Sequence, residues 1–215
     1  MPFVSEIHTE FGRAGIWELT ELPQILSDGF QFTLQEKSEF DIIRASKRQA
    51  EYLATRLLLE QLMGTKTEIG YKNDGRPYLK DPKLNISISH SANVVVVYLS
   101  ETVCGVDAEV KTRNIENVAK RFLHPSEIRH IESSGNRQFL QTLYWCAKEA
   151  IFKCSRQQGV QFDQQIQIKP FDADTKTVFS GTLTVGNATE YFSLQFIEFK
   201  NNIIVFCVEI ENFVA

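Results

Sequence analysis

Hydrophobic positions recur at helical spacing over residues 41–63 of the 215-residue chain. Within this stretch the lysines and arginines fall largely off one broad apolar face. Gly64 follows at the usual position of a C-terminal cap. The pattern therefore predicts one long helix that ends at Gly64. Its apolar face is formed by Ile42, Ile43, Ala50, Leu53, Ala54, Leu57, Leu58 and Leu62.

Two-residue alternation replaces the helical pattern further along the chain. The segment "LNISISH" (84–90) reads as a half-buried strand, and "NVVVVYLS" (93–100) and "VCGVDAEV" (103–110) read as further, more buried strands. The turn sequence "NDG" and the following Pro77 separate the long helix from these strands. A long helix followed by strands predicts a first α+β unit that ends near residue 102.

The second half of the chain repeats this order loosely. Residues 114–132 have helical character with a fresh start at Pro125 or Ser126, and residues 137–156 predict a longer helix. Four β-rich runs separated by Gly, Asn and Asp turns follow this helix. We expect two domains, 1–102 and 103–215. No residue-level repeat is visible between them, so an internal duplication is a hypothesis about architecture only.

Composition narrows the class of protein. A hydrophobic content of 43% and a charged content of 23% are typical of a soluble globular chain, and a net charge of −4 argues against a general nucleic-acid binder. Neither a signal peptide nor a membrane-length apolar run is visible. The four cysteines form no CxxC pair, which favours reduced thiols over zinc or disulfides. These features predict a cytoplasmic protein with no nucleic-acid or membrane partner.

Two carboxylates mark the strand "GVDAEV". Residues two apart point to the same face of a strand, so Asp107 and Glu109 form a pair that suits a hard cation such as magnesium. Gly105, just before them, would let a ligand or another backbone approach closely. The alternative is that the two carboxylates are the solvent-facing side of an edge strand.

A charged stripe marks the helix that contains "YWCAKEAIFK". Trp145, Glu149 and Lys153 recur at four-residue spacing and share one side of the helix. A surface ion pair is one interpretation. The tryptophan favours a cleft instead, since large aromatic side chains are seldom fully exposed. Glu149 could then join Asp107 and Glu109 around one magnesium ion.

Candidate phosphate-binding groups occur in "NDGRPYL" and "ISISHS". Arg76 offers a guanidinium on a constrained turn, and Ser89 and His90 offer a hydroxyl and an imidazole at the end of a strand. A Ser–His nucleophile pair is a poor alternative, because neighbours on a strand point to opposite faces and no G-x-S-x-G elbow is present.

Together and in this order, "NDGRPYL", "ISISHS", "GVDAEV" and "WCAKEAIFK" resemble the signatures of the 4′-phosphopantetheinyl transferases, in particular the longer surfactin-synthetase-activating type. The resemblance implies a pseudo-dimer of two similar α+β halves, each a long helix on a small, mostly antiparallel sheet. The active site would lie in the cleft between them. There, with magnesium, phosphopantetheine would pass from coenzyme A to a serine of an apo acyl or peptidyl carrier protein, releasing adenosine 3′,5′-bisphosphate. A monomer is expected.

The resemblance also implies roles for individual residues. Asp107, Glu109 and Glu149 would be the magnesium ligands, with manganese as an alternative metal because it accepts the same oxygens. Glu149 would also be the general base, and Lys153 would stabilise the leaving phosphate. The residues expected to contact coenzyme A are Arg48 or Arg56, Arg76, Ser89, His90, Lys148 and Lys153.

Further residues are assigned by the same resemblance with less definite roles. Glu127 occupies an acidic position near the cleft. Arg113, Lys120, Arg121 and Arg129 could form a basic surface for an acidic carrier, or simply a solvated helix face. Two other functions compete with the transferase: a magnesium-dependent phosphohydrolase of coenzyme A or nucleotides, and a non-catalytic module that binds coenzyme A or a carrier.

Overall fold

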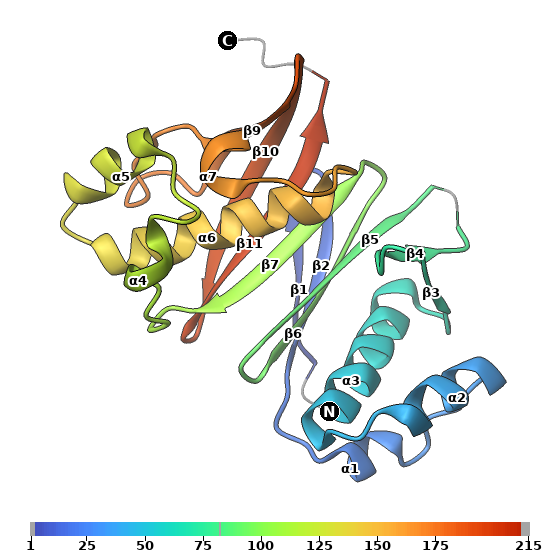
Figure 1. The fold of residues 1–215 in the computed structure, drawn as a ribbon. Coiled ribbons are helices and arrows are strands. Elements are labelled where there is room, and N and C mark those ends of the chain that lie inside the picture. Colours follow the sequence, from blue (N-terminus) through green and yellow to red (C-terminus); the bar gives the residue numbers. More distant parts are fainter. Residues whose placement is uncertain (1–2, 82, 212–215) are drawn as a thin grey trace.

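The protein contains two larger antiparallel sheets, each covered on its outer face by one 18-residue helix (Figure 1). The computed structural model describes residues 3–81 and 83–211. The first sheet has the order β1-β2-β6-β5, with strands Phe3–Thr9, Gly12–Glu18, Val94–Ser100 and Asn85–Ser91. The second has the order β7-β11-β10-β9-β8, with strands Cys104–Val110, Asn202–Ile210, Ala188–Phe199, Val178–Val185 and Ile166–Ile168.

Helices cover the outer faces of these two sheets. On the first sheet the long helix is α3, Ser46–Met63, and on the second it is α6, Arg137–Cys154. None of the helices in the described part of the chain is long and apolar enough to cross a membrane. The remaining elements are α1 (Pro23–Ser27), α2 (Leu34–Ile42), a two-stranded sheet of β3 (Ile69–Tyr71) and β4 (Pro77–Leu79), α4 (Glu116–Ala119), α5 (Pro125–Glu132) and α7 (Phe162–Gln165).

The inner faces of the two sheets pack against each other, which gives the layer order α3, first sheet, second sheet, α6. One apolar cluster fills the space between the sheets and includes Ile16 and Val96 from the first sheet with Val106 and Ile204 from the second. One further cluster lies between each sheet and its long helix. In each sheet the side chains on one face of a strand enter the cluster between the sheets, and those on the other face enter the cluster under the helix. The central strands are therefore almost continuously apolar.

The two sheets repeat one topology. In the first unit, which we define as β2, α3, β5 and β6, a strand leads into the long helix and then into a hairpin whose second strand returns beside the first strand. The second unit, β7, α6, β10 and β11, follows the same path. Even the hairpin turns correspond, since Ala92 and Lys200 each adopt a positive φ, of 47° and 51° respectively.

The units also meet along the edge strands β5 and β7. The hydroxyl of Ser87 accepts a hydrogen bond from the backbone N–H of Val106 at 2.9 Å, and the hydroxyl of Ser89 accepts one from Ala108 at 3.1 Å. Side-chain oxygens of β5 therefore satisfy backbone donors of β7. This seam places the predicted "ISISHS" and "GVDAEV" segments side by side.

The predicted α+β class, with a long helix on each of two antiparallel sheets, is confirmed. The single helix expected over residues 41–63 is wrong at its start, because α2 ends at Ile42 and α3 begins at Ser46. Ile43 and Ala45 have extended backbone angles between the two helices. Gly64 does cap α3, with a φ of 68°. The division into domains 1–102 and 103–215 stays a prediction.

Candidate active site

A lysine, an aspartate and a serine from three different elements meet at the seam between the units. Lys153 of α6 donates from Nζ to the Asp107 Oδ1 of β7 at 2.7 Å, and to the Val106 carbonyl oxygen at 3.0 Å. Ser89 of β5 donates to the same Asp107 oxygen at 3.0 Å and lies 3.2 Å from Lys153 Nζ. The structure thus brings together three of the predicted site residues from segments far apart in the sequence.

The close approach of α6 to β7 depends on Gly105. A Cβ atom at this position would overlap the carbonyl oxygen of Ala150 and would lie 2.9 Å from the backbone nitrogen of Cys154. Only glycine lets the backbone of α6 come this near to the strand. Because α6 is so close, Lys153 reaches the backbone and the carboxylate of β7 at once.

The second carboxylate of β7 also faces α6. Glu109 accepts a hydrogen bond from Trp145 Nε1 at 3.1 Å, and the same Oε1 atom is bonded by the guanidinium of Arg113. The predicted stripe of Trp145, Glu149 and Lys153 is therefore the side of α6 that faces β7. Asp107 and Glu109 contact opposite ends of that stripe.

Glu149 lies between these contacts, in a position that disfavours its charge. Burial raises the pKa of the Glu149 carboxyl, and the negative charge of Asp107 raises it further, against the opposing effects of Lys153 and Arg113. The second oxygen of Asp107, Oδ2, is buried without a hydrogen-bond partner among the described residues. Two interacting carboxylates and an unsatisfied acceptor oxygen fit a divalent cation, which would supply the missing positive charge.

The predicted magnesium ligands are only partly brought together. Among residues 3–81 and 83–211, no three His, Cys, Asp or Glu side chains lie at metal-binding spacing. Asp107 and Glu149 interact electrostatically, whereas Glu109 is engaged by Trp145 and Arg113. The residues fit a metal through Asp107 and Glu149, and the Oε1 atom of Glu109 could join only after releasing Arg113.

His90 lies beside the cluster in a positively charged environment. Its Nε2 atom is 3.1 Å from the Thr55 hydroxyl of α3. Burial, followed by the charges of Arg48, Lys153 and Lys47, lowers the pKa of His90 to about 4. A neutral imidazole among three cations is suited to binding an anion. No sequence pattern pointed to Lys47 or Thr55, which α3 brings here through the fold.

The two arginines proposed as alternatives on α3 have different environments. The side chain of Arg48 is 68% exposed, bonds to Glu51 at 3.0 Å and is close enough to His90 to affect its pKa. Arg56 is 3% exposed, pairs with Glu36 and Glu39 of α2 and does not reach the cluster. Of the two, Arg48 is the one that lies beside the cluster.

Lys148 does not face the cluster either. Its ammonium group is fully buried and directs its donors to Glu127 Oε2 at 2.8 Å and to the carbonyl oxygens of Phe162 and Ile166 at 2.9 and 2.7 Å. Glu127 is 1% exposed and also accepts from the backbone N–H of Ile168 at 2.8 Å. This ion pair holds α5, α6 and β8 together, so neither residue is placed to touch a phosphate.

Arg76 connects the two units. Its guanidinium donates to the carbonyl oxygen of Ser155 at 2.9 Å and to that of Arg156 at 3.4 Å, directly after α6, and it pairs with Asp74 at 2.6 Å. Most of its donors are therefore used within the protein. Few donors of Arg76 remain for a ligand in the adjoining pocket.

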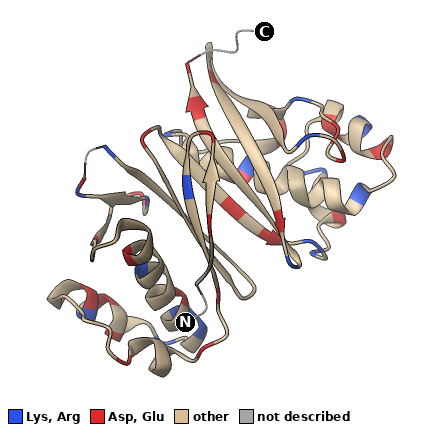
Figure 2. Ribbon diagram, turned by 180° about the vertical axis from the view of Figure 1, so that it is seen from behind, with Lys and Arg blue, Asp and Glu red and all other residues tan. Residues whose placement is uncertain are grey.

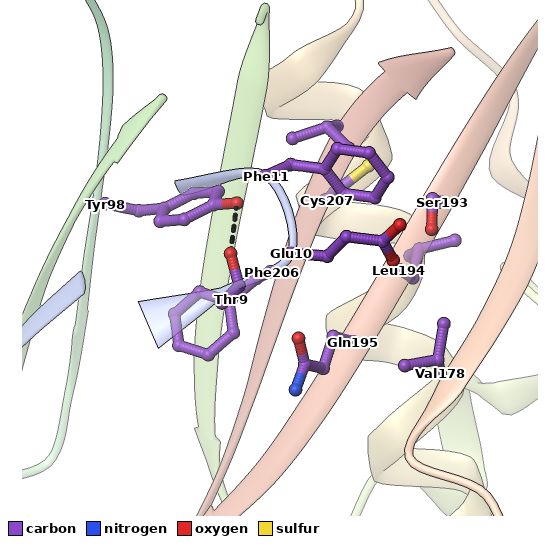
Figure 3. A pocket seen from close by; sticks show the side chains of 11 residues that line it. Thr9, Glu10, Phe11, Tyr98, Val178, Ser193, Leu194, Gln195, Phe206 and Cys207 are labelled. Atoms are coloured by element: carbon purple, nitrogen blue, oxygen red, sulfur yellow. Dashed lines mark hydrogen bonds between the residues drawn. The ribbon is translucent and has the colours of Figure 1, made fainter. Parts of the chain in front are cut away.

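A pocket of about 590 Å³ opens between the units beside the cluster. This volume lies within the range of about 300–1,000 Å³ that is usual for small-molecule pockets. Another hollow, between the sheets near Tyr98 and Phe206, measures only about 10 Å³, and there Tyr98 bonds to Thr9 at 3.0 Å (Figure 3). That hollow holds a water molecule at most. The larger pocket is lined by Arg76, Tyr78, Ile86, Ile88, Phe152 and Lys153, among others.

Comparisons with known proteins point in the same direction. Residues 103–207, which contain most of the second unit, match the family model of the 4′-phosphopantetheinyl transferase superfamily. A 4′-phosphopantetheinyl transferase of Bacillus subtilis is 29% identical over 87 residues, and the alignment covers 39% of each protein. The chain thus matches about two fifths of that relative's length. Both similarities are to phosphopantetheinyl transferases, and the family match contains Asp107, Glu109, Glu149 and Lys153.

Proposed function

We propose that the chain is a phosphopantetheinyl transferase of the surfactin-synthetase-activating type. It would move 4′-phosphopantetheine from coenzyme A to a serine of an apo acyl or peptidyl carrier protein and release adenosine 3′,5′-bisphosphate. The observation that carries this proposal is the cluster of Asp107, Lys153 and Ser89 beside the pocket between the units. The family match over residues 103–207 supports it. Under this proposal domains 1–102 and 103–215 form the two sides of the active-site cleft.

Asp107 and Glu149 would hold the metal, with Glu109 as a third ligand after it leaves Arg113. Magnesium, or manganese with the same oxygen ligands, would neutralise the charge of the coenzyme A pyrophosphate when bound. The unpartnered Oδ2 of Asp107 and the raised pKa of Glu149 support this assignment. The first feature is an acceptor oxygen without a hydrogen-bond donor, and the second is a negative charge that the neighbouring cations do not fully offset. A bound divalent cation would meet both needs.

Lys153 would stabilise the leaving phosphate as the pyrophosphate bond breaks. Its ammonium is part-exposed and lies between Asp107 and the pocket, so it can contact a ligand while keeping its bond to the aspartate. His90 and Arg48 would bind the 3′-phosphate, because the neutral imidazole of His90 lies close to the positive charges of Arg48 and Lys47 on the first-unit side of the seam. Ser89 would orient Asp107 and Lys153 through its hydroxyl.

Glu149 would accept the proton of the carrier serine. A general base works best with a pKa near the operating pH, and burial together with Asp107 moves the pKa of Glu149 upward in that direction. The nucleophile comes from the carrier, so the chain needs no nucleophilic side chain of its own. Glu149 and Lys153 are therefore the two residues to which we assign catalysis.

The carrier would dock beside α4 and α5. Lys120, Arg121 and Arg129 are exposed on these helices and the turn between them, although acidic and basic positions are interspersed over the molecule as a whole (Figure 2). Long-range attraction to an acidic carrier would speed encounter. We expect the reaction to take place in the cytoplasm on a monomeric enzyme.

The direct test is the intact mass of a panel of apo carrier proteins after incubation with the chain, coenzyme A and magnesium. The proposal predicts a gain of one phosphopantetheine on at least one carrier, abolished by chelation and by Asp107→Ala. Hydrolysis of coenzyme A without carrier modification would instead identify a phosphohydrolase. Binding of coenzyme A or a carrier without either reaction would identify a non-catalytic module.

A further inference from the structure

Arg113 occupies the position of a cation in the candidate metal site. Its guanidinium bonds to Glu109 Oε1 and lies 5.6 Å from the centre of the Trp145 ring. Trp145 donates to the same Glu109 oxygen. The guanidinium and the indole therefore hold the same carboxylate oxygen of Glu109.

This arrangement engages one oxygen of Glu109. Because Oε1 already accepts from a guanidinium and an indole, it has little capacity left for a metal ion, and the guanidinium charge offsets that of the carboxylate. In the described part of the chain the three acidic side chains form no metal-binding cluster: Arg113 engages Glu109, and Lys153 engages Asp107. The guanidinium thus takes the charge-balancing role that a metal would have.

Arg113 is also free to leave. Its side chain is 46% exposed, whereas that of Glu109 is 15% exposed. Arg113 lies in the turn after β7, where its backbone N–H bonds to the Val110 carbonyl oxygen at 2.9 Å. Its side chain can therefore swing into solvent without moving the strand that carries Asp107 and Glu109.

We propose that Arg113 competes with the divalent cation for Glu109 and so sets the metal affinity of the site. This inference rests on the proposed function, because it takes the acidic cluster to be a metal site. In the metal-free protein Arg113 holds Glu109 against Trp145. Metal binding replaces the guanidinium, and Arg113 turns outward. The residue is a determinant of metal affinity and takes no part in the transfer step.

The test measures Mn²⁺ binding to the chelator-treated full-length chain by electron paramagnetic resonance, without coenzyme A or carrier. Arg113→Gln should lower the Kd for Mn²⁺ by about tenfold, or about 1.4 kcal/mol, because the competing cation is gone. Arg113→Lys keeps the charge and should lie between Arg113→Gln and the wild type. The matched control is Lys111→Gln, which removes a nearby charge that pairs with Glu198 instead. It should leave the Kd within about twofold.

A second measurement follows Trp145 directly. The chain has two tryptophans, so a Trp17→Phe background leaves Trp145 as the remaining fluorophore. Mn²⁺ or Mg²⁺ should change its emission when Arg113 departs from the ring. In the Arg113→Gln variant this change should shrink by at least about half, since the cation–π contact is already absent.

Three results would overturn the inference. Arg113→Gln could bind Mn²⁺ no more tightly than the wild type, Lys111→Gln could gain as much as Arg113→Gln, or no form of the chain could bind Mn²⁺. Carrier modification is measured separately. If transfer occurs but Arg113→Gln binds no tighter, the competition is refuted and the transferase stands. If Arg113→Gln binds tighter but no carrier is modified, the competition stands and the transferase fails.

Discussion

The two long helices bury a cation in the same way. Arg56 of α3 pairs with Glu36, and Lys148 of α6 pairs with Glu127. Each glutamate belongs to the short helix before the long one. It is the third residue of that short helix, and its side chain completes the helix's capping box. The repeat of topology described above therefore extends to individual residues, in the form of a buried ion pair that fixes a short helix onto a long one.

The helices differ in the residues that follow the buried cation. One position after Lys148 comes Glu149 and five positions after it comes Lys153, whereas Leu57 and Gln61 hold the same places after Arg56. The charged groups that α6 contributes to the site, Glu149 and Lys153, thus have no counterparts on α3. Both long helices are therefore fixed by the same kind of buried ion pair. The candidate catalytic residues occur on only one of these two helices.

Breaking the buried pairs should have the largest effect. Lys148→Met leaves Glu127 buried and unpaired and should cost about 3–5 kcal/mol of unfolding free energy. Arg56→Met should cost less, about 1–3 kcal/mol, because Glu36 keeps Lys66 at 3.1 Å and Glu39 keeps Tyr52 at 2.8 Å. Urea unfolding measures both. The double variant Glu127→Gln/Lys148→Met should recover part of the loss; equal losses for the two single variants would contradict the comparison.

Replacing Lys153 of α6 should lower activity, whereas replacing the matching residue of α3 should not. Lys153→Met should lower the rate of carrier modification by about 10²–10³-fold, since a group that stabilises developing charge is lost. Gln61→Met, at the matching place on α3, is the control and should retain the wild-type rate. Intact-mass time courses measure both rates, and thermal unfolding verifies that each variant folds. A Lys153→Met variant with the wild-type rate would remove Lys153 from the site.

The glycines that face the long helices offer a smaller contrast. Gly105→Ala places a Cβ against the backbone of α6 and should cost about 1–3 kcal/mol of unfolding free energy. Gly15→Ala meets the end of the Leu58 side chain at 2.6 Å. A side chain can shift, so this variant should cost less than about 1 kcal/mol. The opposite order in urea unfolding would mean that α6 does not approach β7 as closely as described.

His90 should give the smallest effect, as a pH dependence. Its folded pKa of about 4 lies below the unfolded value of 6.5, so the unfolded state binds the proton first as the pH falls. The stability contributed by neutral His90 is complete above pH 6.5 and is lost towards pH 4. Between pH 7 and pH 5 the wild type should lose about 1–2 kcal/mol more than His90→Gln does.

The control for this measurement is His8→Gln, whose histidine side chain is 77% exposed. It should follow the wild type across the same pH range in urea unfolding. If His90→Gln and His8→Gln both follow the wild type, His90 is not buried among cations in the way described.

Local sequence patterns predicted most of the helices and strands, but they did not predict which distant segments pair with each other. Alternation located the strands around residues 85–110, and helical periodicity located α3 and α6 because their apolar faces are long. The break between α2 and α3 was missed, since Ile42 and Ile43 continue the apolar pattern where the backbone turns. The capping box at Thr33 and Glu36 was the signal that could have indicated a separate helix.

The meeting of Asp107 and Lys153 was predictable because the strand and helix patterns indicated the faces on which they lie, and the structure joins them at 2.7 Å. Their roles stay predictions. Arg56 and Lys148 were assigned to phosphate because a sequence does not show which cations are buried. The pairing of Arg113 with Glu109 was missed because it depends on the turn after β7. Burial and turn geometry, more than residue type, decided these outcomes.

The central claim is that Glu149 and Lys153, which have no counterparts on α3, take part in the proposed transfer of phosphopantetheine. Its most direct test is the rate at which one responsive apo carrier gains mass, measured with the wild type and with Glu149→Gln, together with the adenosine 3′,5′-bisphosphate released. The account predicts equimolar holo carrier and bisphosphate for the wild type, and a rate about 100-fold lower for Glu149→Gln with an unchanged fold. Full activity of Glu149→Gln, or bisphosphate release without carrier modification, would contradict it.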